Sequence, residues 1–217
     1  MYNNGIDGMM KNLLCTTNDG FEYLTTLRSG TRQQEMGLLE CFVGGMLALG
    51  VLHDVNPAMK ERDLATAKAL TYTCMHFYFD SPTGVAGEVN VATAQGIHAS
   101  ARHNFYIFRP EAIESLYYLN QITGDPIYRE VWRGGVRGRE WGWKAWTAIE
   151  RETRTKYGFG KMSDVRVSGR LEDSTESFLF AETFKYFYLL FKDEQILDLM
   201  HQVLNTEAHP FSVYPLC

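Results

Sequence analysis

The sequence TESFLFAETFKYFYLLF, residues 175–191, has the strongest helical pattern in the chain. Its apolar side chains repeat at helical spacing on two faces, one carrying Phe180, Phe184, Phe187 and Phe191 and the other Leu179, Tyr186 and Leu190. A helix that is apolar almost all round is buried or lines a closed space. The stretch therefore predicts a buried aromatic helix, against which the rest of the chain must pack.

Two carboxylates, Glu176 and Glu182, stand within this aromatic stretch. A buried ionised carboxylate is costly unless it is paired or bound to a cation. One interpretation is an ion pair between Glu182 and Lys185, one turn along the helix. The other is a carboxylate that points at a polar ligand inside an aromatic cavity. The spacing alone leaves both interpretations open.

The remaining periodic segments also have helical spacing. We expect helices over 33–52, 58–78, 111–122, 141–153 and 197–204, joined by connections rich in Gly, Pro, Asn and Asp. Only two stretches, 89–93 and 105–108, have the composition of strands. The sequence predicts an all-α fold of antiparallel helix hairpins, formed by a single domain over residues 1–217.

Composition excludes several classes of protein. The 217 residues are 45% hydrophobic and 22% charged, which is ordinary for a globular chain. The net charge is −5, from 21 basic and 26 acidic residues, so a nucleic-acid partner is not expected. The longest apolar run, 38–52, is shorter than the roughly 20 residues that span a bilayer. The first ten residues have no apolar core of a signal peptide.

One segment interrupts the helical pattern. Residues 131–140 read VWRGGVRGRE, with three glycines and three arginines. Each glycine inside a helix costs about 1 kcal/mol relative to alanine. We therefore expect a looped insertion here. Its arginines could bind an anion, but a solvated loop is the simpler interpretation.

Two polar clusters could carry chemistry. Arg109-Pro110-Glu111, with Glu114 one turn later, places a guanidinium and two carboxylates at a predicted helix start. Acidic residues there also complement the helix dipole, so this pattern alone does not require a site. The second cluster, NTEAHP at 205–210, offers oxygen ligands of the kind that calcium prefers, including the hydroxyl and carbonyl of Thr206. A capped loop is its simpler interpretation.

Four cysteines stand at positions 15, 41, 74 and 217, and their spacing does not match a zinc site. Cys41 and Cys74 lie within apolar helical patterns. On residue type alone they are two buried free thiols, because free cysteine is among the most buried residues.

Five segments taken together, in the same order, resemble glycoside hydrolase family 47, the class I α-1,2-mannosidases of the secretory pathway. The resemblance covers nearly the whole chain. The segments are LECFVGGMLALG (39–50), FRPEAIES (108–115), TGDPIYRE (123–130), ESFLFAETFKYFYLLF (176–191) and NTEAHP (205–210).

The resemblance implies part of an (α/α)7 barrel with a bound calcium ion (Ca2+) and inverting hydrolysis of α-1,2-linked mannose from N-linked, high-mannose glycans of glycoproteins. It also implies a role for each matching residue. Glu111 would be the general base, Arg109, Phe178, Glu182 and Glu207 would contact the sugar, Thr206 would bind the calcium, and Glu114 and Glu176 would be further acidic residues of the site.

The resemblance also changes the interpretation of the cysteines. Cys41 and Cys74 match the disulfide of the family, which implies an oxidising compartment. The intact protein is therefore expected in the endoplasmic reticulum or the Golgi, although this chain has no visible signal or transmembrane segment.

The chain departs from the family in several respects, and the insertion at 131–140 has no counterpart that can be placed there. Family catalytic domains are roughly twice as long, and the segments that supply the general acid lie before the region matched here. Leu38 stands where the family often has a histidine, and Ala101 where it commonly has an acidic residue.

We therefore expect an incomplete chain that is inactive by itself, and that requires the missing N-terminal half of the barrel or another polypeptide. A non-catalytic mannose-glycan-binding protein of glycoprotein quality control is the alternative. A structural helical-repeat protein is a third, weaker one.

Overall fold

The computed structural model describes residues 1–129 and 141–213. The insertion expected at 131–140 lies outside these ranges. The described residues form six α-helices: α1 (Tyr2–Asn12), α2 (Phe42–Leu52), α3 (Lys60–Phe79), α4 (Glu111–Thr123), α5 (Trp141–Thr153) and α6 (Phe184–Phe191). They also form nine short strands: β1 (Leu14–Thr16), β2 (Glu22–Leu24), β3 (Thr26–Arg28), β4 (Thr31–Gln33), β5 (Glu35–Gly37), β6 (Val89–Thr93), β7 (Gly96–Ala99), β8 (Gln202–Leu204) and β9 (Pro210–Ser212).

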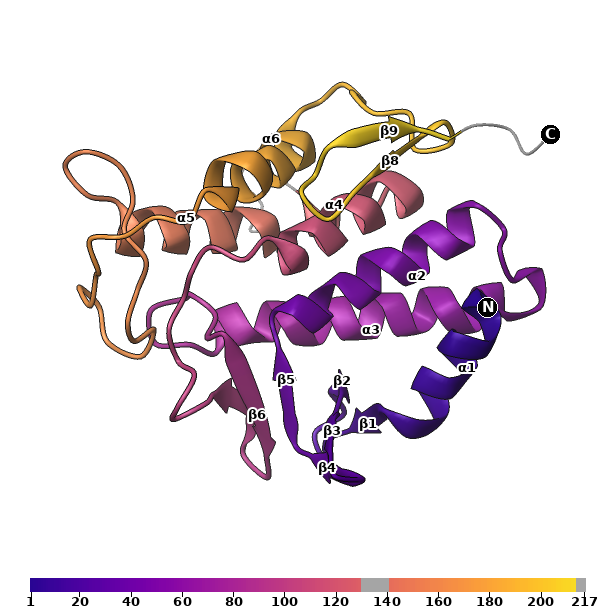
Figure 1. Cartoon of the computed structure of the whole chain (residues 1–217), viewed down its shortest axis with the longest axis horizontal. Coiled ribbons are helices and arrows are strands. Elements are labelled where there is room, and N and C mark those ends of the chain that lie inside the picture. Colours follow the sequence, from indigo (N-terminus) through magenta and orange to yellow (C-terminus); the bar gives the residue numbers. More distant parts are fainter. Residues whose placement is uncertain (130–140, 214–217) are drawn as a thin grey trace.

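The helices form the body of the molecule (Figure 1). Helix α2 packs against both α3 and α4, and α4 in turn packs against α6. Helix α5 contacts α3 and α6. None of the helices in the described ranges is long and apolar enough to cross a membrane. The expected helix hairpins are therefore present, with α2 at their centre.

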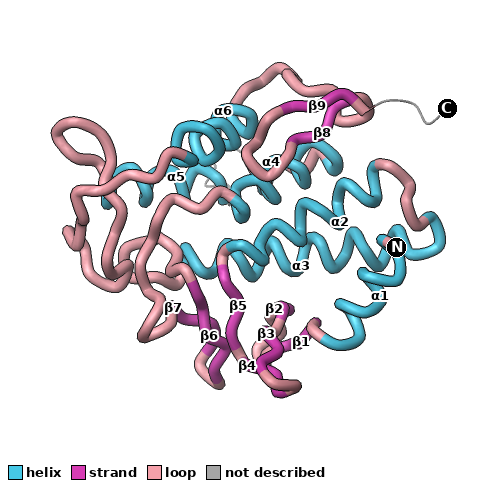
Figure 2. Tube along the Cα trace, in the orientation of Figure 1, coloured by secondary structure: helices cyan, strands magenta, loops and turns pink. Residues whose placement is uncertain are grey.

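The strands correct the all-α expectation. They form four small antiparallel sheets, β1-β2, β3-β4, β5-β6-β7 and β8-β9, and most of them lie below the helices in the view of Figure 2. The β3-β4 turn explains why such hairpins form in a helical chain. Its two residues, Ser29 and Gly30, both have positive φ, as the tightest hairpin turns require.

Several predicted boundaries are also wrong. The helix expected over 33–52 begins only at Phe42, because 35–37 pairs with β6 as strand β5. The helix expected over 197–204 is absent, and its end is strand β8. Residues 105–108 contribute only an isolated bridge at Tyr106. The helices expected at 58–78, 111–122 and 141–153 and the strand at 89–93 are present to within two residues.

The aromatic stretch at 175–191 is helical only from Leu179. It opens with a wide π-turn, Leu179–Thr183, and continues as α6. Thr175, just before it, is exposed, and its hydroxyl donates a hydrogen bond to the carbonyl of Phe159. This side-chain bond holds the segment as a loop and competes with helix formation.

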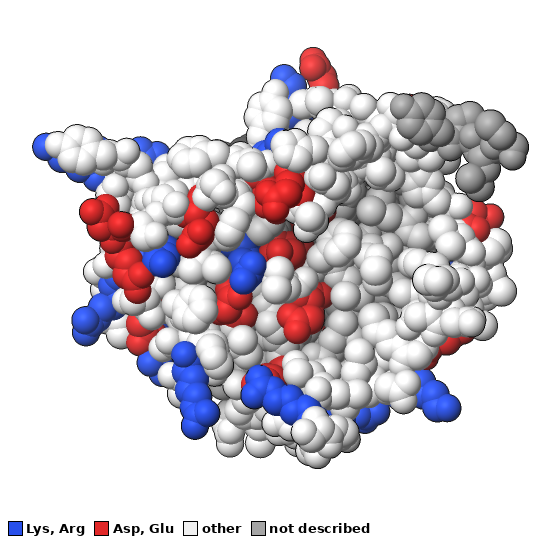
Figure 3. Space-filling model, viewed as in Figure 1, with Lys and Arg blue, Asp and Glu red and all other residues white. Residues whose placement is uncertain are grey.

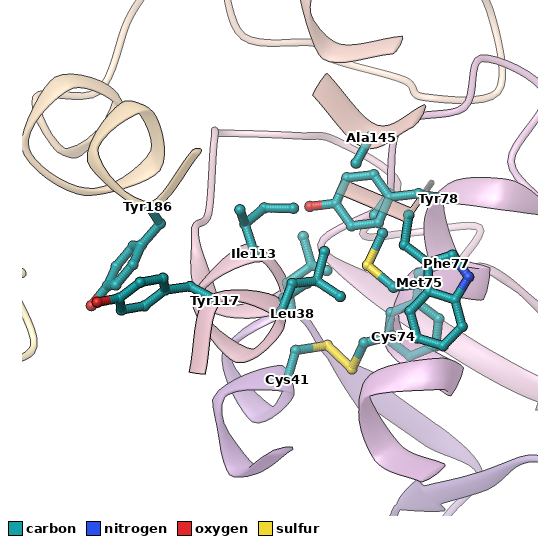
Figure 4. Close-up of a cluster of buried hydrophobic side chains, with 14 of the residues drawn as sticks. Leu38, Cys41, Cys74, Met75, Phe77, Tyr78, Ile113, Tyr117, Ala145 and Tyr186 are labelled. Carbon is teal, nitrogen blue, oxygen red and sulfur yellow. A yellow bond between two sulfur atoms is a disulfide. The ribbon is translucent and has the colours of Figure 1, made fainter. Parts of the chain in front are cut away.

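A disulfide and two glycines fix α2 against its neighbours, and Figure 4 shows the disulfide within the core. The fully buried disulfide Cys41–Cys74 joins the start of α2 to α3. At Gly44, an added Cβ would lie 2.2 Å from the hydroxyl of Thr71 on α3. The amide of Gly45 donates to the Ser115 hydroxyl on α4 (2.8 Å). Because these positions have no side chain, both neighbouring helices approach the backbone of α2.

This close packing predicts opposite effects for two glycine substitutions. Gly44→Ala should lower the free energy of unfolding by about 1–3 kcal/mol, because the new methyl group overpacks the α2–α3 contact. Gly8→Ala in α1, where an added Cβ meets nothing within 4 Å, should raise it by about 0.5–1 kcal/mol. Urea denaturation of both variants tests this. Equal changes in the free energy of unfolding for the two variants would contradict the close packing inferred at Gly44.

Candidate functional site

A pocket of about 250 Å³ lies where four segments meet. Its lining comes from the start of α2, the start of α4, the π-turn and the loop between β8 and β9: Leu39, Phe42, Glu111, Glu114, Glu182, Leu204, Asn205 and Thr206. Figure 3 shows acidic side chains gathered near the centre of the face that it draws. The fold therefore brings together three of the predicted carboxylates and Thr206 from distant parts of the sequence.

Glu114 is held in the pocket by a tyrosine. The hydroxyl of Tyr186, on α6, donates a hydrogen bond of 2.5 Å to Oε1 of Glu114. Burial raises the pKa of Glu114 to about 8, and the charges of Glu111 and Glu182 add to the shift. The bond from Tyr186 opposes it. Tyr186 is not recognisable as a site residue from the sequence, because its place in an aromatic helix indicates only a core residue.

Glu111 is the first residue of α4 and one of its oxygens lacks a partner. Oε2 is buried and accepts no hydrogen bond from the described residues. Burial raises the pKa of Glu111 to about 7, opposed by a backbone hydrogen bond and by the charge of Arg109. The helix start explains the position of Glu111, but favourable dipole interaction alone would lower its pKa. Burial therefore outweighs the dipole.

Glu182 does not depend on Lys185 for a hydrogen bond. The ammonium of Lys185 donates instead to the backbone carbonyl of Ala208 (2.8 Å). Burial raises the pKa of Glu182 to about 7, with further contributions from the negative charges of Glu207 and Glu111. The ion-pair interpretation of the sequence thus gives way to a carboxylate crowded by others of like charge.

Arg109 is held by a residue that sequence analysis missed. Its Nε donates to Oε1 of Glu88 at 2.6 Å, and the other oxygen of Glu88 is buried with no partner among the described residues. Glu88 lines a second pocket, of about 280 Å³, which shares Leu39 with the first. An acidic residue directly before the strand-like stretch 89–93 was the only signal in the sequence.

The β8–β9 loop presents Thr206 to the pocket. The side-chain carbonyl of Asn205 accepts hydrogen bonds from the amides of Glu207 (3.1 Å) and His209 (2.8 Å). Ala208 completes the turn with a φ of 56°. The capped loop that the sequence suggested is present, and the same capping fixes the orientation of the Thr206 backbone.

Four of the predicted site residues lie outside the pocket lining: Arg109, Glu176, Phe178 and Glu207. Phe178 and Glu176 are both half-buried. Phe178 directly precedes the π-turn, and Glu176 lies two residues further back. Glu207 is exposed, but its charge acts on Glu182. Of these residues, Glu207 is linked to the carboxylate cluster by its charge, and Phe178 by its place next to the π-turn that carries Glu182.

The donor set of the pocket suits a hard cation. Its polar lining consists of carboxylate, amide and hydroxyl groups, whose oxygens are the ligands that calcium prefers. Burial leaves one oxygen of Glu111 without a partner and raises its pKa, so a cation in the pocket would stabilise the ionised form of this carboxylate. Across residues 1–129 and 141–213, no group of three or more His, Cys, Asp or Glu side chains is arranged to hold a metal directly.

Comparison with known proteins identifies relatives. The model of glycosyl hydrolase family 47 matches residues 1–213. Mannosyl-oligosaccharide 1,2-alpha-mannosidase MNS1 of Arabidopsis thaliana is 35% identical over 98% of this chain and 36% of its own length. Human mannosyl-oligosaccharide 1,2-alpha-mannosidase IC is 36% identical over 98% of this chain and 32% of its own length.

A solved structure of similar fold bears a name of the same kind as these relatives. The alpha-1,2-mannosidase from Trichoderma reesei superposes with a TM-score of 0.81 at 26% identity, over 97% of this chain and 46% of that one. The chain thus spans about a third of the length of the curated relatives it matches, and just under half of the solved structure.

The raised carboxyl pKa values predict how stability depends on pH. The pKa values of Glu111 and Glu114 are about 7 and 8 in the folded chain, against 4.5 for an ordinary glutamate. The folded state therefore holds protons that the unfolded state releases, and stability should fall as pH rises from about 5 to 8. Without added divalent cation, we expect a loss of at least about 2 kcal/mol.

Chemical denaturation between pH 5 and 8.5 measures this loss. Glu114→Gln, which keeps an acceptor for Tyr186, should make the dependence on pH shallower. An unfolding free energy that rises over the same pH interval would contradict the raised pKa values of Glu111 and Glu114.

Proposed function

The chain belongs to glycosyl hydrolase family 47, and we propose that it carries the calcium-binding part and the general-base part of an inverting α-1,2-mannosidase site. Its substrates would be high-mannose N-linked glycans of glycoproteins. The observation that carries the proposal is the convergence of Glu111, Glu114, Glu182 and Thr206 on one pocket. The names of the relatives supply the substrate class.

Glu111 is the proposed general base. A base works best when its pKa lies near the working pH, and burial raises the pKa of Glu111 to about 7. Its carboxylate would accept a proton from the attacking water as the glycosidic oxygen leaves. Inverting hydrolysis also requires a general acid, and we assign none to this chain.

The neighbouring residues would bind the mannose. Arg109 uses its Nε to bind Glu88, which leaves its terminal nitrogens for sugar hydroxyls. Glu182 and Glu207 would accept hydrogen bonds from other hydroxyls, and the ring of Phe178 would pack against the sugar ring. Glu114 and Glu176 would complete the acidic wall, with Glu114 oriented by Tyr186.

Thr206 is the proposed direct calcium ligand, through its hydroxyl and carbonyl oxygens. Bound calcium would supply a positive charge that holds water and offsets the repulsion among the surrounding carboxylates. The Asn205-capped loop supports this role, because it fixes the backbone carbonyl of Thr206 before any ion binds.

Calcium binding is tested by thermal unfolding. A ligand at 100 times its Kd stabilises the folded state by about 2.7 kcal/mol, so millimolar calcium should raise the Tm of the chain and EDTA should reverse the rise. Thr206→Val should reduce calcium affinity at least tenfold.

Thr147→Val is the matched control. The hydroxyl of Thr147 bonds only within α5, so this variant should respond to calcium as the original chain does. An equal response of Thr206→Val would contradict the ligand assignment.

An aromatic face supports a partner for the chain. Phe180 is 61% and Tyr188 is 57% exposed. Beside them lies an apolar hollow of about 180 Å³ lined by Trp146, Phe184, Phe187, Tyr188 and Phe191. Contiguous exposed apolar surface is typical of an interaction site. We propose that polypeptide equivalent to the uncovered half of the Trichoderma reesei enzyme packs against this face and supplies the general acid.

The secretory pathway is the proposed location of the intact protein. The buried disulfide Cys41–Cys74 supports it, because such bonds form in oxidising compartments.

The isolated chain is therefore expected to bind α-1,2-mannobiose in the presence of calcium but to release no mannose from it. Calorimetry measures the binding, and a coupled assay for free mannose measures turnover. Arg109→Ala should weaken binding at least tenfold, whereas Arg102→Ala, an exposed arginine outside the pocket lining, should not. Mannose release by the isolated chain would overturn its predicted inactivity. Absence of binding would argue against the mannose site.

A further inference from the structure

The backbone of Phe108 adopts a conformation that bulky residues rarely take. Its φ is 68° although it is not glycine, and its side chain is fully buried. Left-handed backbone at such a residue persists only where the surroundings impose it. Its ring packs edge-on against that of Tyr106, with centroids 5.5 Å apart. Phe108 directly precedes the segment that bears Arg109 and Glu111, so its conformation sets the direction of that segment.

The following residues have little freedom to correct a change at Phe108. Arg109 precedes Pro110, and a residue before proline is disfavoured in the helical conformation. Helix α4 begins at Glu111, immediately after the proline. The direction in which the chain enters α4 is therefore decided at Phe108.

One side chain holds this position from another element. The hydroxyl of Thr183 donates a hydrogen bond to the carbonyl of Phe108, 75 residues away in the sequence, and both residues are fully buried. Thr183 ends the π-turn and follows Glu182. The bond thus joins the side chain of the residue after Glu182 to the backbone carbonyl of the residue before Arg109.

Three other helical threonines use their hydroxyls within their own helix. Thr123, Thr147 and Thr153 each donate to the carbonyl four residues earlier in their own helix, which is the common local arrangement. For Thr183 that carbonyl would be Leu179, at the start of the wide π-turn. π-turns inside helices frequently occur at functional sites. Here the last residue of the π-turn, Thr183, donates its hydroxyl to the carbonyl of Phe108 in another segment.

We propose that Thr183 is a positioning residue that holds Phe108 in its left-handed conformation, and thereby sets Arg109 and Glu111 relative to Glu182. The inference rests on the proposed function only for its effect on mannose binding. The conformational effect follows from the structure of the chain itself.

Three substitutions test this proposal. Thr183→Val replaces the hydroxyl with a methyl group and leaves the shape of the side chain nearly unchanged. Thr183→Ser keeps the hydroxyl. Thr153→Val is the matched control, because Thr153 is also fully buried and bonded to a backbone carbonyl. Loss of a buried hydrogen bond alone would lower the stability of both valine variants in the same way.

The first readout is the backbone conformation of Phe108, followed by its Cα and Cβ chemical shifts in NMR spectra. Thr183→Val should move these shifts away from left-handed values, whereas Thr183→Ser and Thr153→Val should leave them unchanged. Unchanged Phe108 shifts in a folded Thr183→Val variant would overturn the proposal. This readout does not depend on any ligand.

The second readout is the affinity for α-1,2-mannobiose in calcium. Thr183→Val should weaken binding at least fivefold, Thr183→Ser should recover it, and Thr153→Val should bind as the original chain does. Equal affinities of the two valine variants would overturn the positioning role. If the original chain does not bind the disaccharide, the proposed function fails, and the Phe108 shifts still decide whether Thr183 holds the turn.

Discussion

The close approach of α2 to its two neighbours is the constraint on which the other features depend. Ser115 accepts a hydrogen bond from the amide of Gly45 and donates one of 2.6 Å to the carbonyl of Cys41. One buried hydroxyl on α4 is therefore satisfied entirely by the backbone of α2. Because Glu111 and Glu114 lie on the same helix as Ser115, the α2–α4 contact also fixes the depth at which these carboxylates are buried.

The buried carboxyl groups of the pocket destabilise this packing. Burial and mutual repulsion raise the pKa of Glu111, Glu114 and Glu182 together, so at neutral pH each exists partly as the protonated acid. A tight core supplies the free energy that holds such groups close together. The same repulsion is what the proposed calcium ion would offset, so the proposed metal site depends on the helices that hold these carboxylates close together.

The sequence predicted those parts of the molecule whose pattern is local. The helices around 58–78, 111–122 and 141–153 have clear periodicity, and the polar cluster at the start of α4 is visible within residues 109–114. The role of Glu88 could not be predicted, because its ion pair with Arg109 depends on how a strand edge meets a helix start. The prediction of a helix at 197–204 was wrong, because the pairing of 202–204 with 210–212 outweighs a short apolar periodicity. The grouping of Glu111 with Glu182 required the family resemblance, since no spacing links residues so far apart.

The disulfide Cys41–Cys74 has a kinetic consequence. It closes a loop with a sequence separation of 33 residues, and both cysteines are fully inaccessible to solvent. A dissolved reductant can attack the sulfur atoms only during moments when the α2–α3 pair opens. Reduction of this bond in the folded chain therefore requires the two helices to separate, so its rate at a fixed reductant concentration reports on how readily the core opens.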